Sequence, residues 1–202
     1  GELEAMQDGV RKMTPEALAS LQAEVVTLTK LVDDLHQLSL SDEGALAYRK
    51  SPTDLVSLLE IVAGVFRARF ASRQLSLTLS LPQQAPFFGD ADRLMQLFTN
   101  LMENSLRYTD AGGGLKISLT LLPAKLLLHF DDSAPGVSDE QRQQIFERFY
   151  RTESSRNRAS GGSGLGLAIG KNIVEAHGGT VSAEHSDSGG LRITVELPLD
   201  AN

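Results

Sequence analysis

Six apolar residues near the start of the chain recur at alternating intervals of three and four residues, a spacing that puts them on one face of an α-helix. They are Leu18, Leu21, Val25, Leu28, Val32 and Leu35. Such a seam packs against other helices in coiled coils and bundles. Thr14 followed by Pro15 predicts where the helix begins, because threonine caps helix N-termini and proline suits the first turn. The seam therefore predicts a helix that needs another helix beside it.

A shorter apolar stripe precedes this seam and predicts a second helix, so that residues 1–44 form a helical hairpin. Its members are Leu3, Met6, Val10 and Met13. Two helices with narrow stripes bury little surface, and we expect two hairpins to pair as a homodimeric four-helix bundle. The alternative is that the hairpin packs on its own globular domain. Residues 45–53 lie in a stretch rich in Ser, Asp, Gly and Pro, which predicts a linker.

Helical and strand patterns are mixed over residues 54–202, which we expect to form one domain. Helices are predicted over 54–72, 90–108, 139–150 and 165–177. Strands are predicted over 75–81, 115–121, 125–131, 180–185 and 191–197. Neighbouring strands in this order can form antiparallel hairpins. The pattern predicts an α+β fold built as a two-layer α/β sandwich.

The composition limits the classes of function. Of the 202 residues, 41% are hydrophobic and 22% are charged, the values of a soluble globular protein. No apolar run approaches the about 18 residues of a membrane span, so we expect a membrane to be reached only through segments outside this chain. The net charge of −7 argues against a nucleic-acid partner. With no cysteine, neither a disulfide nor a thiolate zinc site is expected.

Two amides share the helix predicted over 90–108. Asn100 and Asn104 are four residues apart and so lie on one face. An asparagine oxygen can bind Mg²⁺, which proteins hold with few side chains together with phosphates and water. Arg107 and Tyr108 bring a cation and a flat ring to the same end of the helix. The alternative is that the two amides only form surface hydrogen bonds.

A pair of carboxylates ends the strand predicted over 125–131. Asp131 and Asp132 stand just before the Pro-Gly turn that contains Gly136. A carboxylate in this place can cap the turn, or it can accept a hydrogen bond from an exocyclic amine such as that of adenine.

The segment VSDEQRQQIFERFYR predicts a helix that begins with a capping box, because Ser138 and Gln141 have the required spacing. Two phenylalanines near its end are flanked by Arg148 and Arg151. These aromatic residues could anchor a loop from which a cation reaches phosphate.

The stretch GGSGLGLAIGKNIVEAHGG, from Gly161 to Gly179, places a glycine-rich loop directly against the start of a predicted helix. Exposed N–H groups at a helix N-terminus, approached by a loop with few side chains, form a ready phosphate site. The alternative is a surface loop followed by an ordinary helix.

Read in order, these four segments resemble the N, G1, F and G2 boxes of the sensor histidine kinases of two-component systems, within the GHKL ATP-binding superfamily. The resemblance covers residues 52–199, and the preceding hairpin resembles the second part of the family's dimerisation domain. It implies the Bergerat fold, with ATP and Mg²⁺ as cofactors. It also implies phosphoryl transfer to a histidine and onward to a cognate response regulator, on the cytoplasmic side of the bacterial inner membrane.

The resemblance implies a role for each matching residue. Asn104 matches the asparagine that binds Mg²⁺, and Asn100 is its catalytic partner one turn earlier. Arg107 stands where a basic residue reaches the phosphates, and Tyr108 where an aromatic ring packs beside adenine. Asp132 matches the aspartate that recognises the adenine amine.

The remaining matches lie in the two later boxes. Arg148 and Arg151 match catalytic positions from which a cation approaches the γ-phosphate. The glycines of the last box would close as a lid over the phosphates and open for nucleotide exchange. The nucleotide-binding set is completed by Gly162, Gly164, Leu165 and Gly166 here and by Gly136 in the earlier segment that contains Asp132.

The chain departs from the family pattern in two places. The family's Asp-x-Gly-x-Gly reads Asp132-Ser-Ala134-Pro-Gly136 here, and we expect Ala134 to alter nucleotide affinity modestly. None of the four histidines stands in an H-box context. We therefore expect the phosphoacceptor to precede Gly1, and this chain alone to bind ATP without phosphorylating itself.

Two other classes of function stay open. One is a GHKL ATPase, in which the first N-box position is typically a glutamate that activates water. Here that position is Asn100, and an amide is a poor general base. The other is a non-catalytic dimerisation and nucleotide-sensing module, which would bind ATP without transfer to any histidine.

Overall fold

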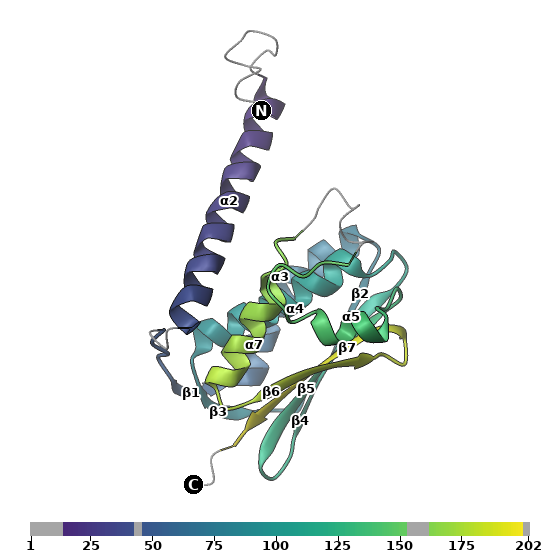
Figure 1. Cartoon of the computed structure of the whole chain (residues 1–202). Coiled ribbons are helices and arrows are strands. Elements are labelled where there is room, and N and C mark those ends of the chain that lie inside the picture. Colours follow the sequence, from purple (N-terminus) through teal and green to yellow (C-terminus); the bar gives the residue numbers. More distant parts are fainter. Residues whose placement is uncertain (1–13, 43–45, 153–161, 200–202) are drawn as a thin grey trace.

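The computed structural model describes residues 14–42, 46–152 and 162–199. A long helix, α2 (Pro15–Asp42), extends away from a layered body that holds the other elements (Figure 1). The Thr14 hydroxyl accepts a hydrogen bond from the Ala17 N–H at 3.2 Å, as expected of a helix N-cap. The first helix of the predicted hairpin lies outside the described residues.

The body has two layers, a five-stranded sheet and the helices packed on one of its faces (Figure 1). In spatial order the strands are β2 (Ser76–Ser80), β4 (Gly114–Leu121), β5 (Lys125–Ser133), β7 (Gly189–Pro198) and β6 (Thr180–His185). β2 and β4 are parallel, and the other neighbours are antiparallel. The predicted two-layer α+β sandwich is confirmed.

The helices of the body are α3 (Leu55–Ser72), α4 (Ala91–Tyr108), α7 (Gly166–Ala176) and the short α5 (Asp139–Gln144). α5 contacts the edge strand β6. α4 contacts both α3 and α7 and supplies much of the core. Phe98 of α4 stacks on Phe130 of β5 with ring centroids 6.2 Å apart. This packing holds α4 on the sheet, and Asn100 of the same helix bonds to the start of α7.

A second, two-stranded sheet that the sequence did not predict joins β1 (Ser51–Asp54) to β3 (Pro86–Gly89). Residues 51–53 were expected to end a linker and instead belong to β1. The Asp54 carboxylate ties this sheet to the body, because it accepts hydrogen bonds from the N–H groups of Ala85 and Val56. The body therefore includes the last residues of the predicted linker.

The helix predicted over 139–150 is wrong beyond residue 144, where α5 ends. Its N-terminal capping box is present as predicted, with reciprocal bonds between Ser138 and Gln141. Phe149 has a left-handed φ of 61° and donates its N–H to the Gly164 carbonyl at 3.0 Å. Beyond α5 the chain therefore meets the glycine-rich loop instead of continuing as a helix.

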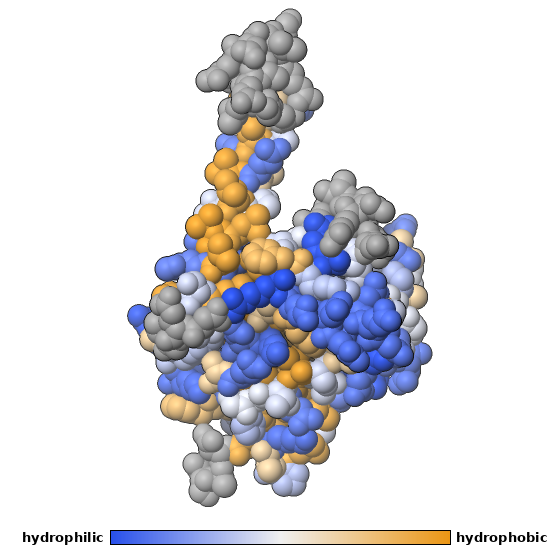
Figure 2. Space-filling view, viewed as in Figure 1, coloured by the Kyte–Doolittle hydropathy of each residue, from blue (hydrophilic) through white to orange (hydrophobic). Residues whose placement is uncertain are grey.

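The predicted seam of α2 is exposed, and apolar side chains gather along this helix in the space-filling view (Figure 2). Leu18, Val25, Leu28, Val32 and Leu35 are 46–62% exposed. Only the C-terminal part of the helix packs on the body, where Leu38 is buried and Asn172 of α7 donates a hydrogen bond to the Ser41 hydroxyl. None of the helices in the described ranges combines the length and apolarity needed to cross a bilayer.

Candidate functional site

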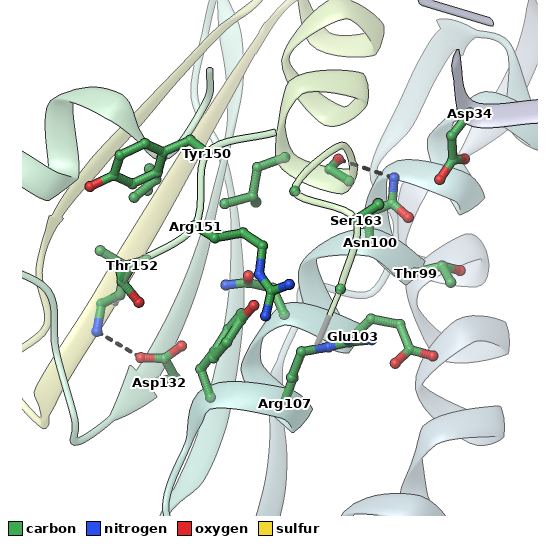
Figure 3. A pocket seen from close by; sticks show the side chains of 18 of the residues that line it. Asp34, Thr99, Asn100, Glu103, Arg107, Asp132, Tyr150, Arg151, Thr152 and Ser163 are labelled. Atoms are coloured by element: carbon green, nitrogen blue, oxygen red, sulfur yellow. Dashed lines mark hydrogen bonds between the residues drawn. The ribbon is translucent and has the colours of Figure 1, made fainter. Parts of the chain in front are cut away.

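A cavity of about 1020 Å³ lies between α2, α4, the start of α7 and the segments that follow β5 and α5 (Figure 3). This volume suits a ligand of some size. The structure brings most of the predicted site residues to its wall. These are Asn100, Asn104, Arg107, Tyr108, Asp132, Gly136, Arg151, Gly162, Gly164 and Gly166. Segments far apart in sequence thus meet at one place, as the motif interpretation requires.

Two predicted residues do not line the cavity. Arg148 is exposed and lies beyond the early end of α5, and its role beside a bound phosphate stays a prediction. Leu165 is 1% exposed and belongs to the hydrophobic core. Its burial anchors the end of the glycine-rich loop, while its N–H donates to the Ser163 hydroxyl at 3.2 Å.

Asp132 is a buried carboxylate at one side of the cavity and is 6% exposed. One carboxylate oxygen accepts a hydrogen bond from the Leu191 N–H at 2.6 Å, and the other accepts one from the Ser105 hydroxyl at 3.1 Å. Burial raises the pKa of Asp132 to about 6, although both hydrogen bonds lower it. At neutral pH the group is therefore mostly ionised and can only accept hydrogen bonds.

An irregularity in the sheet places the Asp132 carboxylate. Asp131 pairs with Arg192, whereas Ser133 pairs with Gly189, so the register between β5 and β7 shifts around Asp132. The side chain takes the Leu191 N–H in place of a regular ladder bond. Gly190 is needed beside it, because a Cβ atom there would lie 2.4 Å from the carboxylate.

Asn100 links α4 to the start of α7. The side chain is 9% exposed, and its Nδ2 donates a hydrogen bond to the Gly166 carbonyl at 3.1 Å. Figure 3 shows this bond on one side of the cavity and Asp132 on the other, with Arg107 and Arg151 between them. Carboxylate, guanidinium and amide groups thus surround a single space that opens onto the start of α7.

The glycine-rich loop approaches the site where side chains would not fit. Gly164 has a φ of +74°, and a Cβ atom there would lie 2.8 Å from the Phe149 backbone. A Cβ atom at Gly162 would lie 3.0 Å from a guanidinium nitrogen of Arg107. Within the described residues no side chain caps the start of α7, where N–H groups point toward an anion in the cavity.

The sequence analysis missed several residues of the site. Lys30 and Asp34 of α2 reach the cavity and form an ion pair at 2.9 Å. Glu103 lines it as well and holds Arg69 of α3 through two hydrogen bonds. These residues gave no motif signal. In contrast, Gly189 and Gly190, which open β7, are a sequence signal for the close approach of another group to this strand, here the Asp132 carboxylate.

Ala134, the departure from the family's G1 pattern, is exposed and lies outside the left-handed region of φ. Its methyl group is 3.8 Å from where a Cβ atom on Gly189 would stand, an ordinary contact. The backbone here does not require glycine, so the strain on which the expected change of affinity depended is absent.

The donor set fits a hard cation held mainly by phosphate. Asn104 offers an amide oxygen at the cavity wall, on the same helix face as Asn100. Within the described ranges, His, Cys, Asp and Glu side chains form no group of three or more that could hold a metal ion. Mg²⁺ suits such a site, because it keeps several waters and takes few protein ligands alongside a nucleotide.

Comparison with protein families supports the same interpretation. Residues 89–201 match the family model described as histidine kinase-, DNA gyrase B- and HSP90-like ATPase. The signal transduction histidine-protein kinase BaeS of Escherichia coli K12 is 70% identical over 200 residues, which make up 99% of this chain and 43% of that relative. Stretches such as LVDDLHQLS point to a close resemblance to this relative, and the identity of 70% over nearly the whole chain confirms it. The chain spans less than half of its length.

Solved structures of histidine kinases have the same fold. AdeS of Acinetobacter baumannii superimposes with a TM-score of 0.85 at 28% identity, over 100% of this chain and 93% of that one. Full-length ShkA, solved in complex with AMPPNP, gives a TM-score of 0.78 at 26% identity, over 93% of this chain and 40% of that one. Both matches include the long helix as well as the layered body, because they cover nearly the whole chain.

Proposed function

The chain belongs to the family of histidine kinase-, DNA gyrase B- and HSP90-like ATPases, and from this premise we propose that it transfers the γ-phosphoryl group of ATP to a histidine. The observation that carries the proposal is the placement of Asp132 and Asn104 in one cavity, at the N-terminus of a helix with uncapped N–H groups. The buried carboxylate suits the base, the amide oxygens suit Mg²⁺, and the N–H groups at the start of α7 suit the phosphates.

In this proposal Asp132 binds the base. Its buried, ionised carboxylate accepts a hydrogen bond from the exocyclic amine of adenine. Tyr108, from the end of α4, packs beside the ring. Gly136 lines the same cavity, where a Cβ atom would lie 3.2 Å from the carbonyl oxygens of Gly189 and Gly190.

The phosphates lie toward α7 in the same proposal. N–H groups at the start of α7 and the guanidinium groups of Arg107 and Arg151 hold the negative charge. Asn104 and Asn100 are the residues that would face a bound Mg²⁺, with Asn104 as ligand. When bound, Mg²⁺ neutralises charge on the β- and γ-phosphates. The protein's own contribution is positioning and charge complementarity, since phosphoryl transfer needs little covalent chemistry from the enzyme.

The acceptor histidine is proposed to come from another segment. His36 is exposed on α2, His129 contacts the Thr194 hydroxyl, His177 is buried, and His185 pairs with Asp139. Each of them has an ordinary structural setting. The chain alone should therefore bind ATP without phosphorylating itself. The amide at Asn100 favours transfer to a protein over hydrolysis, because it does not activate water.

The partners of the complete protein belong to the proposal as well. The exposed α2 seam suits a homodimer, in which two helical hairpins bury their apolar faces against each other. A cognate response regulator would take the phosphoryl group from the histidine. The similarity to sensor kinases supports a place on the cytoplasmic side of the bacterial inner membrane.

Calorimetric titration with ATP, with and without Mg²⁺, tests the nucleotide site. We expect Asp132→Asn to weaken ATP binding about 10-fold or more, since a hydrogen bond to a charged group is lost. Asp131→Asn is the matched control, because that neighbouring carboxylate pairs with Arg192 instead of lining the cavity. Equal affinity of Asp132→Asn and the unaltered chain would contradict the assignment of the base site.

A further inference from the structure

The Asp132 carboxylate is held by one backbone donor and one side-chain donor, and the side chain is Ser105. Ser105 is 4% exposed, and its hydroxyl donates to Asp132 at 3.1 Å from the neighbouring helix α4. The Leu191 N–H holds the other oxygen from the opposite side. A hydroxyl facing an ionised carboxylate can only donate, so this bond favours the charged form of Asp132.

Charged groups near this pair come from several elements. Arg107 of α4 and Arg151 of the segment after α5 line the same cavity as Asp132. Asp131 of β5 pairs with Lys116 of β4 and Arg192 of β7, on the strand position beside Asp132 whose side chain alternates to the other face of the sheet, and Asp187 before β7 is exposed. Asp131 raises the pKa of Asp132 by its charge, while Arg192 is bonded to Asp131 and Asp187. The groups that lower the pKa of Asp132 are Leu191 and Ser105. The Leu191 donor is a backbone N–H group, which a substitution leaves in place. Ser105 is therefore the donor that a substitution can remove.

We propose that Ser105 is a positioning residue that keeps Asp132 in the ionised, acceptor-only form and so selects adenine over guanine. The inference rests on the proposed ATP site. Adenine presents an amine donor at the position where guanine presents a carbonyl acceptor. An ionised Asp132 accepts from the first and repels the second, whereas a protonated Asp132 can donate to guanine. Ser105 acts only through Asp132 and does not line the cavity.

The test compares the pH dependence of nucleotide binding in Ser105→Ala and the unaltered chain. Alanine is a better helix former than serine, so α4 should remain folded. Thr109→Val is a matched control at the end of the same helix. Thr109 is 3% exposed, and its hydroxyl makes no hydrogen bond within the described ranges, so valine removes a buried hydroxyl without touching Asp132.

ATP affinity should fall with pH around 6 in the unaltered chain, because Asp132 becomes protonated there. In Ser105→Ala the midpoint of this fall should move up by about one pH unit, which corresponds to one lost hydrogen bond to a carboxylate. Thr109→Val should keep the original midpoint. The same ligand is used throughout, so its own protonation affects all three curves alike.

GTP serves as the second probe. The preference for ATP over GTP at pH 7 should narrow severalfold in Ser105→Ala and recover at pH 8.5. An ATP affinity that falls by the same factor at every pH, or an unmoved midpoint, would overturn the role of Ser105. Absence of ATP binding by the unaltered chain would instead contradict the proposed function, so the two failures are distinguishable.

Discussion

The side-chain amide of Asn100 donates a hydrogen bond to the carbonyl oxygen of Gly166 at 3.1 Å. Residues 66 positions apart in sequence are thereby joined, and α4 holds the first residue of α7. The same helix presents Asn104 to the cavity one turn later. One helix therefore both holds the start of α7 and carries the amide proposed to face Mg²⁺.

Asn100→Ala should lower ATP affinity about 5- to 30-fold, because the Gly166 carbonyl loses its donor and the start of α7 is released. Calorimetric titration with ATP measures the effect. Asn172→Ala is the control, since this amide lies on α7 but bonds to Ser41 of α2. An equal loss in both variants would show that any weakening of α7 suffices, and would contradict a specific role for Asn100.

Gly164→Ala should weaken ATP binding, because its φ of +74° and the nearby Phe149 backbone leave no room for a methyl group. Gly64→Ala in α3 is the matched control, with nothing within 4 Å of the added atom. There we expect a gain of about 0.5–1 kcal/mol in the free energy of unfolding and unchanged ATP affinity. Chemical denaturation and nucleotide titration of both variants check the pair. Full ATP affinity in Gly164→Ala would show that the loop geometry is not required.

Asp132→Asn should stabilise the fold at neutral pH even though it weakens ATP binding. The native pKa of about 6 lies above the ordinary value of 3.8, so protonation favours the folded state. That contribution is fully present below the ordinary value and is lost as the pH rises through 6. The free energy of unfolding of the variant, relative to the unaltered chain, should therefore improve by about 2 kcal/mol between pH 4 and pH 7.5. If the free energies of unfolding of the variant and the unaltered chain differed by the same amount at every pH in this range, the burial of an ionised Asp132 would be contradicted.

His177 should make the fold sensitive to mild acid. It accepts a hydrogen bond from the Asp90 N–H at 2.9 Å and lies against the Ile173 carbonyl at 2.7 Å, and burial lowers its pKa below 6.5. A histidine with a lowered native pKa is protonated first in the unfolded state, so stability falls as the pH drops below 6.5. His177→Gln should lose about 1–2 kcal/mol at pH 7.5 and less at pH 5. Urea denaturation at both pH values measures this, and an equal loss at both would argue against a neutral buried imidazole.

Charges on the α2 seam should prevent self-association without touching the nucleotide site. Val25 and Val32 are 62% and 59% exposed, so Val25→Glu with Val32→Glu should leave the body folded. Sedimentation at increasing concentration should show association of the unaltered chain and a monomer for this variant, with equal ATP affinity. Ala23→Glu adds a charge to the same helix away from the seam. Dissociation by Ala23→Glu as well would locate the contact elsewhere on α2.

Local sequence signals predicted most of the fold because their causes are local. The Thr14 cap, the capping box at Ser138 and the alternating strands of the main sheet all depend on residues within a few positions. β1 and β3 were missed because they are four residues long, contain Pro52 and Pro86, and exist only through pairing with each other.

The site was predictable as a set of motifs, but its contacts were not. Ser105 and Leu191 reach Asp132 across 27 and 59 residues of sequence, and only the tertiary fold brings them together. The early end of α5 was missed as well. Beyond residue 144 the chain meets the glycine-rich loop through the bond between Phe149 and Gly164, which no local preference encodes.

Transfer of radiolabelled phosphate from ATP tests the central claim most directly. The chain is incubated with Mg²⁺ and γ-labelled ATP, alone and with a separate helical hairpin that carries an intact H box from the same kinase. We predict no label on the chain, label on the hairpin, and loss of that label with Asn104→Ala. An unlabelled hairpin despite measured ATP binding would contradict the kinase assignment and favour a nucleotide-sensing module, and rapid release of free phosphate would favour an ATPase.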